Sequence, residues 1–277
     1  MSRLPVYAEK SILIAVKTYP TLSARYDELV CTAGIDENGN WFRIYPIPFR
    51  KLDYDKQYKK YSWLTLALER NERDFRPESY RPTFIEGAQI TGEIKADGGA
   101  WVERRKHVLK KVYCSLELLL HEAKDPAVRT SLATFKPDKI IGFVVESADR
   151  DWDEDKVAEI EKRRKQMTLF DEDNPLRVVR KVPYKFSYRI EDADGKKAKM
   201  MIEDWEIGQL YWNSLARRGS EKEACADVQK KYFDDFAKKK DLHLFLGTTL
   251  EYHNVGSNPF IIIGTFHPKP QIQSELF

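Results

Sequence analysis

The strongest constraint on the fold is a short polar turn between two strand-like segments near the start of the chain. Residues 29–35 and 41–50 are rich in β-branched and aromatic side chains, and the dipeptide Asn38-Gly39 lies between them. Asparagine and glycine both tolerate the positive φ that tight hairpin turns require. We therefore predict a β-hairpin at this position.

The outgoing strand of this hairpin supplies the first candidate binding residues. Trp41, Arg43 and Tyr45 alternate along it, so we expect their side chains on one face. Aromatic rings with a cation among them suit a flat partner such as a nucleobase. In the alternative interpretation, one face of the hairpin belongs to the core and Arg43 is a solvated charge at the edge.

Strand-like segments dominate the first hundred residues, where almost no helix is predicted. Residues 74–82 contain two prolines, and we expect an ordered loop or an irregular extension there. Five short strands at this spacing are typical of a small closed or nearly closed barrel, and the oligonucleotide-binding (OB) barrel is a leading candidate. The five predicted strands are residues 11–19, 29–35, 41–50, 62–68 and 84–94.

The pattern changes after residue 99, where two helices precede the next predicted strand. Residues 101–113 form a basic helix, and residues 115–123 form a second helix with Ser115 as its expected N-cap. Beyond them, strands and helices are mixed. The predicted strands are residues 139–146, 182–190, 198–202, 242–249 and 259–266, and the predicted helices are residues 153–166, 203–216 and 221–240.

We therefore predict an α+β protein with two small OB-like β-barrels joined by a helical spacer, with helices inserted in the second barrel. Residues 1–99 are the expected N-terminal barrel, residues 100–136 the spacer, and residues 137–277 the second β unit with its C-terminal tail. The similar layout of the two β units is the basis of this prediction, because the sequence itself contains no strict repeat.

Composition indicates a globular protein with a charged surface, since 33% of the 277 residues are charged and 42% are apolar. No apolar run approaches the roughly 20 residues that a membrane-spanning helix needs, and the first ten residues lack the apolar core of a signal peptide. The three cysteines are too scattered for a metal site or a disulfide framework. We expect a cytoplasmic protein with no membrane partner.

The net charge of +3 is only mildly basic, so local clusters carry more information than the total. Three such clusters occur, at residues 104–106, 162–165 and 238–240. Each lies on or beside a predicted helix, where a run of charges is usually a solvated face. Contact with phosphate groups is the alternative.

The most specific short pattern is Gln-x-x-Leu-Phe, which occurs twice. It resembles the motif by which bacterial DNA polymerases and repair proteins dock on the sliding clamp, where leucine and phenylalanine fill an apolar pocket. The terminal copy follows a proline-rich segment and is well placed to reach a partner, whereas the internal copy could instead anchor a helix end on the core. The first copy consists of Gln166, Leu169 and Phe170, and the second of Gln273, Leu276 and Phe277.

Four carboxylates form the candidate catalytic group. Asp204 and Glu206, with Asp192 or Asp194 from the preceding predicted hairpin, could bind Mg²⁺, whose preferred ligands are carboxylate oxygens. Such a site would suit a nuclease. In the alternative interpretation these residues cap a helix and fill a polar turn, and no cofactor is expected.

Several segments resemble a known family, the bacterial dual-OB-domain proteins, which are poorly characterised and occur in bacterial and mobile-element genomes. The resemblance extends over nearly the whole chain. It implies two OB-like barrels and nucleic-acid binding, and it supplies no catalytic residue. The segments that carry it are residues 31–35, 41–50, 76–79, 203–206 and 245–248.

The sequence therefore predicts a non-enzymatic protein that binds nucleic acid, prefers single strands and is recruited to the sliding clamp. Two alternatives remain: a Mg²⁺-dependent nuclease using Asp204 and Glu206, and a protein-interaction adaptor with no nucleic-acid role. The expected stacking and phosphate-binding residues are Trp41, Arg43, Tyr45, Arg50, Lys59, Lys60 and Trp63.

Overall fold

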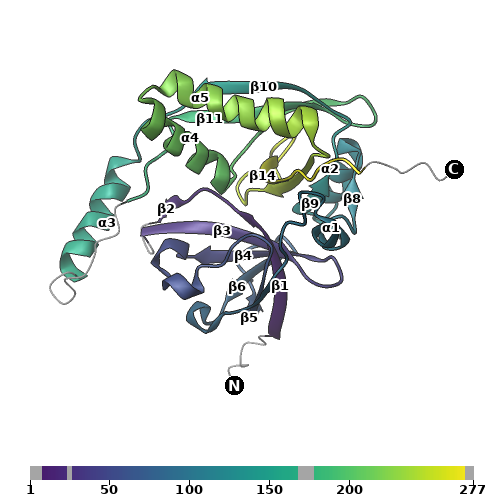
Figure 1. The fold of residues 1–277 in the computed structure, drawn as a ribbon. Coiled ribbons are helices and arrows are strands. Elements are labelled where there is room, and N and C mark those ends of the chain that lie inside the picture. The colour runs from purple at the N-terminus through teal and green to yellow at the C-terminus, as the bar shows by residue number, and fades with distance from the viewer. Residues whose placement is uncertain (1–7, 24–26, 168–177, 272–277) are drawn as a thin grey trace.

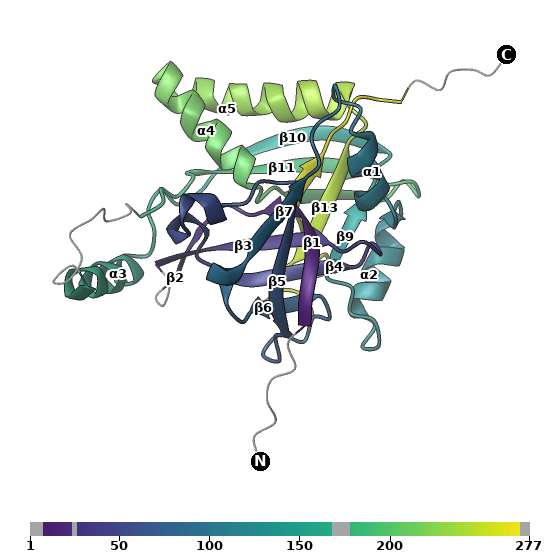
Figure 2. The same cartoon turned by 60° about the horizontal axis from the view of Figure 1, so that its bottom comes forward.

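The first half of the protein is a closed five-stranded β-barrel (Figures 1 and 2). The computed structural model describes residues 8–23, 27–167 and 178–271. The first strand of the barrel pairs with two others and so closes the ring in the order β1-β3-β4-β6-β5. The barrel strands are β1 (Ala8–Lys17), β3 (Asp27–Ile35), β4 (Trp41–Ile47), β5 (Ser62–Arg70) and β6 (Ser79–Pro82).

The predicted hairpin is confirmed as β3 and β4, which pair in antiparallel register. Gly39 has a φ of +89°, as the turn requires. The Asp36 carboxylate accepts hydrogen bonds from the backbone N–H groups of Asn38 and Asn40, at 2.9 and 2.8 Å. The turn therefore has the local chemistry that its sequence predicted.

The fifth strand of the barrel differs from the prediction. It is β6, which lies in the segment expected to be a loop and pairs in parallel with β4. Pro82 is the last residue of β6, so its missing N–H does not interrupt the ladder. Residues 84–94, predicted as the fifth strand, instead contain a short 3₁₀ turn, η3 (Ile85–Gly87), and β7 (Gln89–Glu93), which pairs with β5 beside the ring.

The second half combines two sheets with helices, which makes the whole chain α+β. One sheet has the order β10-β11-β12 and the other the order β14-β13-β9-β8. The described strands of this half do not close into a ring, so the structure does not show the second barrel. Its strands are β8 (Val112–Tyr113), β9 (Leu132–Phe135), β10 (Lys139–Ser147), β11 (Tyr184–Glu191), β12 (Lys197–Met201), β13 (His243–Thr248) and β14 (Phe260–Phe266).

Two helices of the second half, α4 and α5, cover one side of β10 and β11, and α5 lies across the sheet (Figure 1). Ser115 caps α2 as predicted, and Asp204 and Ser220 cap α4 and α5. By contrast, α3 projects away from the rest of the molecule (Figures 1 and 2). The helices are α1 (Val102–Val108), α2 (Leu116–Lys124), α3 (Glu154–Met167), α4 (Trp205–Arg218) and α5 (Glu221–Gln229), and α5 continues into the π-helix η4 (Lys230–Ala237).

The remaining short elements belong to the barrel side. They are β2 (Thr21–Ser23), η1 (Phe49–Lys51) and η2 (Tyr54–Lys56). The predicted spacer, residues 100–136, contains α1 and α2 but also β8 and β9, which are strands of the second half's sheet. Most of this segment is therefore built into the second half rather than standing between two units.

The two halves share a hydrophobic core. Phe245 and Phe266 of β13 and β14 pack with Leu13 and Ala33 of the barrel. Trp41 also joins this contact, with its ring centroid 5.4 Å from that of Phe245. The core fixes the position of the barrel against the second half, and the candidate site lies at the edge of this junction.

Candidate functional site

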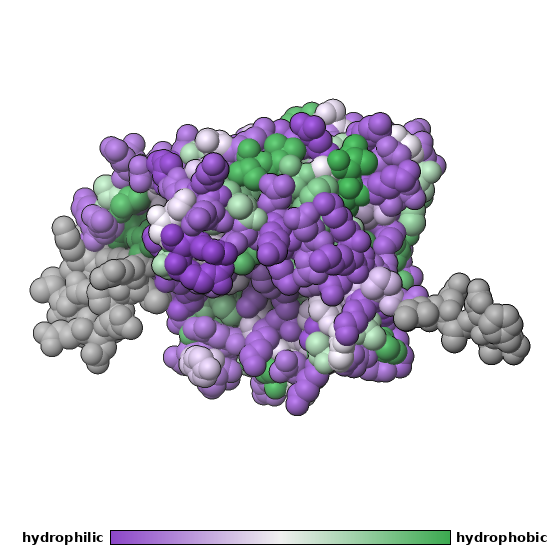
Figure 3. Space-filling view, turned by 45° about the horizontal axis from the view of Figure 1, so that its top comes forward, coloured by the Kyte–Doolittle hydropathy of each residue, from purple (hydrophilic) through white to green (hydrophobic). Residues whose placement is uncertain are grey.

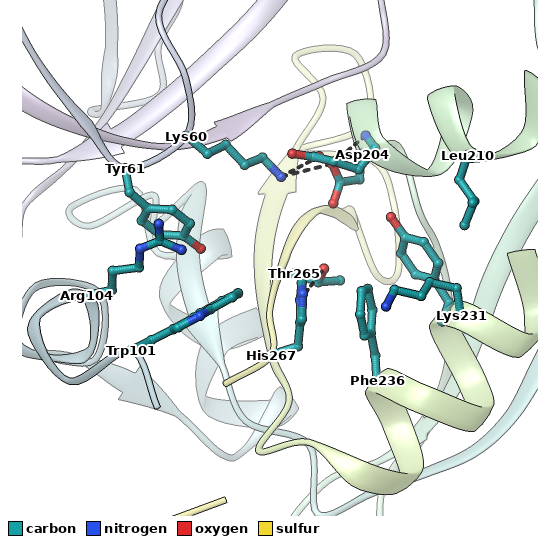
Figure 4. A pocket seen from close by; sticks show the side chains of 12 residues that line it. Lys60, Tyr61, Trp101, Arg104, Asp204, Leu210, Lys231, Phe236, Thr265 and His267 are labelled. Carbon is teal, nitrogen blue, oxygen red and sulfur yellow. Dashed lines mark hydrogen bonds and ion pairs between the residues drawn. The ribbon is translucent and has the colours of Figure 1, made fainter. Parts of the chain in front are cut away.

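A cavity of about 450 Å³ lies where the barrel, α1, α4, η4 and β14 meet (Figure 4). We call it the junction cavity. Tyr61, Arg104 and Trp101 stand on one side of it, and Phe236, Lys231 and Leu210 stand on the other. Its lining consists of Lys60, Tyr61, Trp101, Arg104, Asp204, Glu206, Leu210, Lys231, Tyr232, Phe236, Thr265 and His267.

Two aromatic residues of this lining have an unusual backbone conformation. Tyr61 has a φ of +65° and Trp101 a φ of +57°, in the left-handed region. Bulky residues rarely adopt it, and such strain costs about 1–3 kcal/mol per residue and tends to cluster at functional sites. Two strained aromatic residues at one cavity therefore mark it as the leading candidate site.

Arg104 packs against both of these rings. Its guanidinium carbon lies 4.0 Å from the centroid of Tyr61 and 4.9 Å from that of Trp101. Its Nε donates to the carbonyl of Ile94 at 2.9 Å, and its terminal nitrogens have no partner among the described residues. The cation is thus held in place by the rings while part of its hydrogen-bonding capacity stays available.

A second aromatic wall is formed by His267 and Phe236, which stack with centroids 3.6 Å apart. His267 also contacts Trp101, at 4.9 Å between centroids. Burial, with the nearby Lys60 and Lys231, lowers the pKa of His267 to about 3. The imidazole is therefore neutral at physiological pH, so it offers a flat face without adding a charge.

The π-helix η4 contributes Lys231, Tyr232 and Phe236 to the cavity. Stretches of π-helix are rare and occur frequently at functional sites. Lys231 donates to Asp235 at 2.8 Å and lies 4.9 Å from the Phe236 ring centroid. The irregular helix thus places a ring and a cation together on the side facing Trp101.

Two carboxyl groups and a lysine of the lining bond to one another. The Nζ of Lys60 donates to Asp204 Oδ1 at 3.0 Å and to Glu206 Oε2 at 2.6 Å. Asp204 caps α4 by accepting from the backbone N–H of Glu206 at 3.1 Å. The Asp204 side chain is 1% exposed, and its Oδ2 is buried without a hydrogen-bond partner in the described part of the chain.

The pKa values of the two carboxyl groups are shifted in opposite directions. Burial raises the pKa of Asp204, and the neighbouring Glu206 raises it further. Burial alone would raise the pKa of Glu206 as well, but Lys60 and the bond with Asp204 outweigh it and bring the pKa to about 2. Glu206 therefore carries the negative charge of the pair, and Asp204 holds its proton more readily than an ordinary aspartate.

The cavity as a whole favours an anion. Lys60, Arg104 and Lys231 bring three positive charges, against the two carboxyl groups of Asp204 and Glu206. Lys60 is paired with these two carboxyl groups and Lys231 with Asp235, so Arg104 is the lining cation that has no carboxylate partner in the described part of the chain. The arrangement suits a ligand with a flat ring and a negative charge.

The junction cavity lies across the boundary between two protein families. Residues 8–110 match a family described as a domain of unknown function (DUF8758), and residues 111–277 match another described in the same words (DUF8757). The second match covers more than half of the chain. The chain belongs to the DUF8757 family. No curated protein matches it.

Both family regions contribute to the cavity. The DUF8758 region supplies Lys60, Tyr61, Trp101 and Arg104, and the DUF8757 region supplies all the other lining residues. The sequence had singled out Lys60, Asp204 and Glu206 for different reasons, and the structure brings them into direct contact. It had not singled out the ring residues. The basic cluster at 104–106 was the one signal for Arg104.

The structure corrects the placement of Arg43. This side chain is buried rather than exposed, at 4% of its accessible surface. It donates to the hydroxyls of Ser79 and Ser131, at 3.1 and 2.8 Å, and to the carbonyls of Ser131 and Thr248, at 3.1 and 3.4 Å. Arg43 thus links the barrel to the DUF8757 region, because β9 and β13 cover this face of β4.

The other predicted binding residues do not form one face. Trp41 is half-buried against Phe245, and Trp63 is half-buried with its ring 5.2 Å from that of His107. Tyr45 is 39% exposed. Arg50 pairs with Glu28 at 2.7 Å, Lys59 is exposed, and Lys60 lines the junction cavity.

Arg43 and Tyr45 line a second cavity, of about 630 Å³, on the barrel side of the β13–β14 loop. The arginine side chains of this cavity bond to other groups of the protein. Arg76 pairs with Asp74 at 2.6 Å, and Arg76 and Arg43 both donate to the carbonyl of Thr248. These two cations are therefore committed to the protein's own groups.

Of the carboxylates proposed as a metal site, Asp204 and Glu206 lie together at Lys60, whereas Asp192 bonds to other groups. Asp192 is buried in the β11–β12 turn and accepts from the backbone N–H groups of Leu116, Asp194 and Lys196 at 2.8, 3.0 and 2.8 Å. The Nζ of Lys60 lies between the carboxylates of Asp204 and Glu206. Over residues 8–23, 27–167 and 178–271, no group of three His, Cys, Asp or Glu side chains could hold a metal ion. The residues present do not fit the Mg²⁺ site of a nuclease.

The two Gln-x-x-Leu-Phe motifs fall largely outside the described residues. Leu169, Phe170, Gln273, Leu276 and Phe277 all lie there. Gln166 is in the last turn of α3, the helix that projects from the molecule. Among the described helices, none is long and apolar enough to cross a membrane.

Proposed function

We propose that this protein binds single-stranded nucleic acid and that the junction cavity holds one unstacked nucleotide. The observation that supports this best is the combination of Trp101, Tyr61 and the His267–Phe236 stack with an incompletely bonded Arg104 in one cavity. The proposed role is binding without catalysis.

The physical argument is that single-strand binding proteins combine the same two elements. Bases stack on aromatic side chains, at about 1–3 kcal/mol per base, and cations follow the phosphates. The volume of about 450 Å³ lies within the range of roughly 300–1,000 Å³ that is usual for small-molecule pockets. A base in a duplex must first be extruded, at a cost of a few kcal/mol, so single strands bind more readily.

The barrel topology also supports this proposal. If the five barrel strands are numbered 1 to 5 along the chain, their order around the ring is 1-2-3-5-4. Strands 3 and 5, which are β4 and β6, are parallel. OB barrels, which bind oligonucleotides and oligosaccharides, have this Greek-key order. The proposed OB-like architecture extends to this barrel alone, since the described strands of the second half form open sheets.

An aromatic cavity can also receive a quaternary ammonium ligand. The charges of the lining argue against that ligand here, because the Arg104 guanidinium, which has no carboxylate partner in the described part of the chain, would repel it. A nucleotide, by contrast, presents a ring to the aromatic walls and a phosphate to the cations.

The test is a titration of labelled oligonucleotides with the protein, measured by fluorescence anisotropy. We expect single strands to bind more tightly than the matching duplex. Arg104→Gln should weaken binding about tenfold, as expected when a charged contact worth about 1.4 kcal/mol is lost. The matched control is Lys106→Gln in the same helix, an exposed residue paired with Glu103 at 2.6 Å.

The outcome is interpreted together with the melting temperature of each variant, since Arg104 also packs on two rings. Binding lost by the folded Arg104 variant and retained by the Lys106 variant supports the proposal. A wild-type protein that binds no oligonucleotide, or equal losses in both folded variants, contradicts it.

Docking on the bacterial sliding clamp is the second part of the proposed function. The support is the repetition of the Gln-x-x-Leu-Phe pattern, whose first copy begins at Gln166 in the last turn of the projecting α3. Surface plasmon resonance on an immobilised clamp tests it. Replacing Leu276 and Phe277 by alanine should abolish the signal of the terminal copy, and unchanged binding would rule that copy out.

A further inference from the structure

We infer that a bound strand leaves the junction cavity through a groove between α4 and η4, where Lys230 and Lys239 contact its phosphates. The ligand is then an oligonucleotide rather than a free nucleotide. This inference rests on the proposed function and adds a path for the strand.

The first observation is continuity. A hollow of about 480 Å³ lies beside the junction cavity and shares Leu210 and Lys231 with it. Both residues stand on the same side of the junction cavity in Figure 4, away from Trp101. A chain that places one nucleotide in the cavity can therefore continue into the groove past these two residues.

The second observation is that the groove's own carboxylates are already paired. Asp227 bonds to Arg217 at 2.8 Å and to Arg218 at 3.2 Å. Asp235 bonds to Lys231 at 2.8 Å, and Asp234 bonds to Lys238 at 2.6 Å. Each negative charge in the groove is thus matched by at least one cation.

Two lysines of the groove have no carboxylate partner among the described residues. Lys230 and Lys239 are exposed and line the groove, and neither side-chain ammonium group has a hydrogen-bond or ion-pair partner in the described part of the chain. Figure 3 views the molecule from the side of α5, and hydrophilic residues cover most of that surface. The uncompensated charge of the groove is therefore positive, which is complementary to a phosphate backbone.

This arrangement predicts a change in salt dependence. Each phosphate contact on a single strand contributes about 0.7 to the slope of log K against log salt, through counterion release. Removing both lysines should therefore reduce that slope by about 1.4. Contacts inside the junction cavity should be unaffected.

The experiment compares a double variant, Lys230→Gln with Lys239→Gln, with a control of the same charge change. Lys10→Gln with Lys196→Gln serves as control, because both lysines are exposed and their ammonium groups lack a partner in the described part of the chain. Binding of a dinucleotide and of an eight-nucleotide single strand is measured at several salt concentrations.

We expect the groove variant to bind the octanucleotide more weakly, with the reduced slope, and to bind the dinucleotide like the wild type. The control should match the wild type for both ligands. An unchanged octanucleotide slope in the groove variant overturns the strand path and leaves the proposed function standing. If the wild type binds neither ligand, the proposed function itself fails.

Discussion

Replacing Lys60 by methionine tests the charge arrangement of the junction cavity most directly. The substitution keeps an unbranched side chain but removes the ammonium that bonds to Asp204 at 3.0 Å and to Glu206 at 2.6 Å. Breaking a buried ion pair costs about 3–5 kcal/mol, because the remaining charge loses its compensation.

The loss here lies at or below the lower end of that range. The Asp204 side chain is 1% exposed, whereas that of Glu206 is 48% exposed, so water screens much of the Glu206 contribution. Since the half-exposed Glu206 carries the negative charge of the pair, we expect a loss of about 1–3 kcal/mol in the free energy of unfolding at pH 7.

The loss should depend on pH. The pKa of Glu206 is about 2 in the folded protein and lies near 4.5 when unperturbed. Its pairing therefore stabilises the wild type above pH 4.5, and this stabilisation disappears as the pH falls towards 2. The variant lacks it at every pH, so the difference between the two proteins should narrow in acid.

The assay is urea denaturation of wild type and variant at pH 7 and pH 3.5. Lys106→Met is the control, with an expected change within about 0.5 kcal/mol because both partners of its ion pair are exposed. A difference below 1 kcal/mol at pH 7, or the same difference at both pH values, would refute the reasoning.

Three further substitutions test other parts of the structure. Arg43→Met should destabilise the protein by about 3–5 kcal/mol in urea denaturation, since it leaves buried acceptors unpaired. The folded fraction should keep its oligonucleotide affinity, and a selective loss of affinity would instead support the predicted binding face on β4. Trp101→Ala should weaken oligonucleotide binding by about tenfold or more in anisotropy titrations, and unchanged affinity would exclude stacking on Trp101. Gly39→Ala should lower the melting temperature and reduce the free energy of unfolding by about 1 kcal/mol. The reason is that φ is +89° and the new Cβ would lie 3.0 Å from the Lys110 side chain. An unchanged melting temperature would contradict this prediction.

The sequence was most informative where local chemistry decides the structure. Asn38-Gly39 predicted the β3–β4 hairpin, and Ser115 predicted the start of α2, because turns and caps depend on a few neighbouring residues. The closing strand β6 was missed, since two prolines argue against a strand unless they lie at its ends. Strand pairing over long distances, which decides whether a sheet closes, leaves no local signal.

The candidate site was predicted only in pieces. Lys60 and Asp204 are 144 residues apart, so their contact follows from the fold and not from a motif. The left-handed conformations of Tyr61 and Trp101 oppose the intrinsic preference of bulky residues, and tertiary packing must impose them. Arg43 was misplaced because alternation along a strand gives two faces without saying which one another part of the chain will cover.

The division of the junction cavity between DUF8758 and DUF8757 has a consequence for genomes. Neither region alone contains both aromatic walls, so a gene that encoded one without the other would specify a protein with an incomplete cavity. Selection on the cavity would then keep the two regions fused, or at least inherited together. The frequency with which the two regions occur together across genomes therefore indicates whether selection acts on the complete cavity or on each region separately.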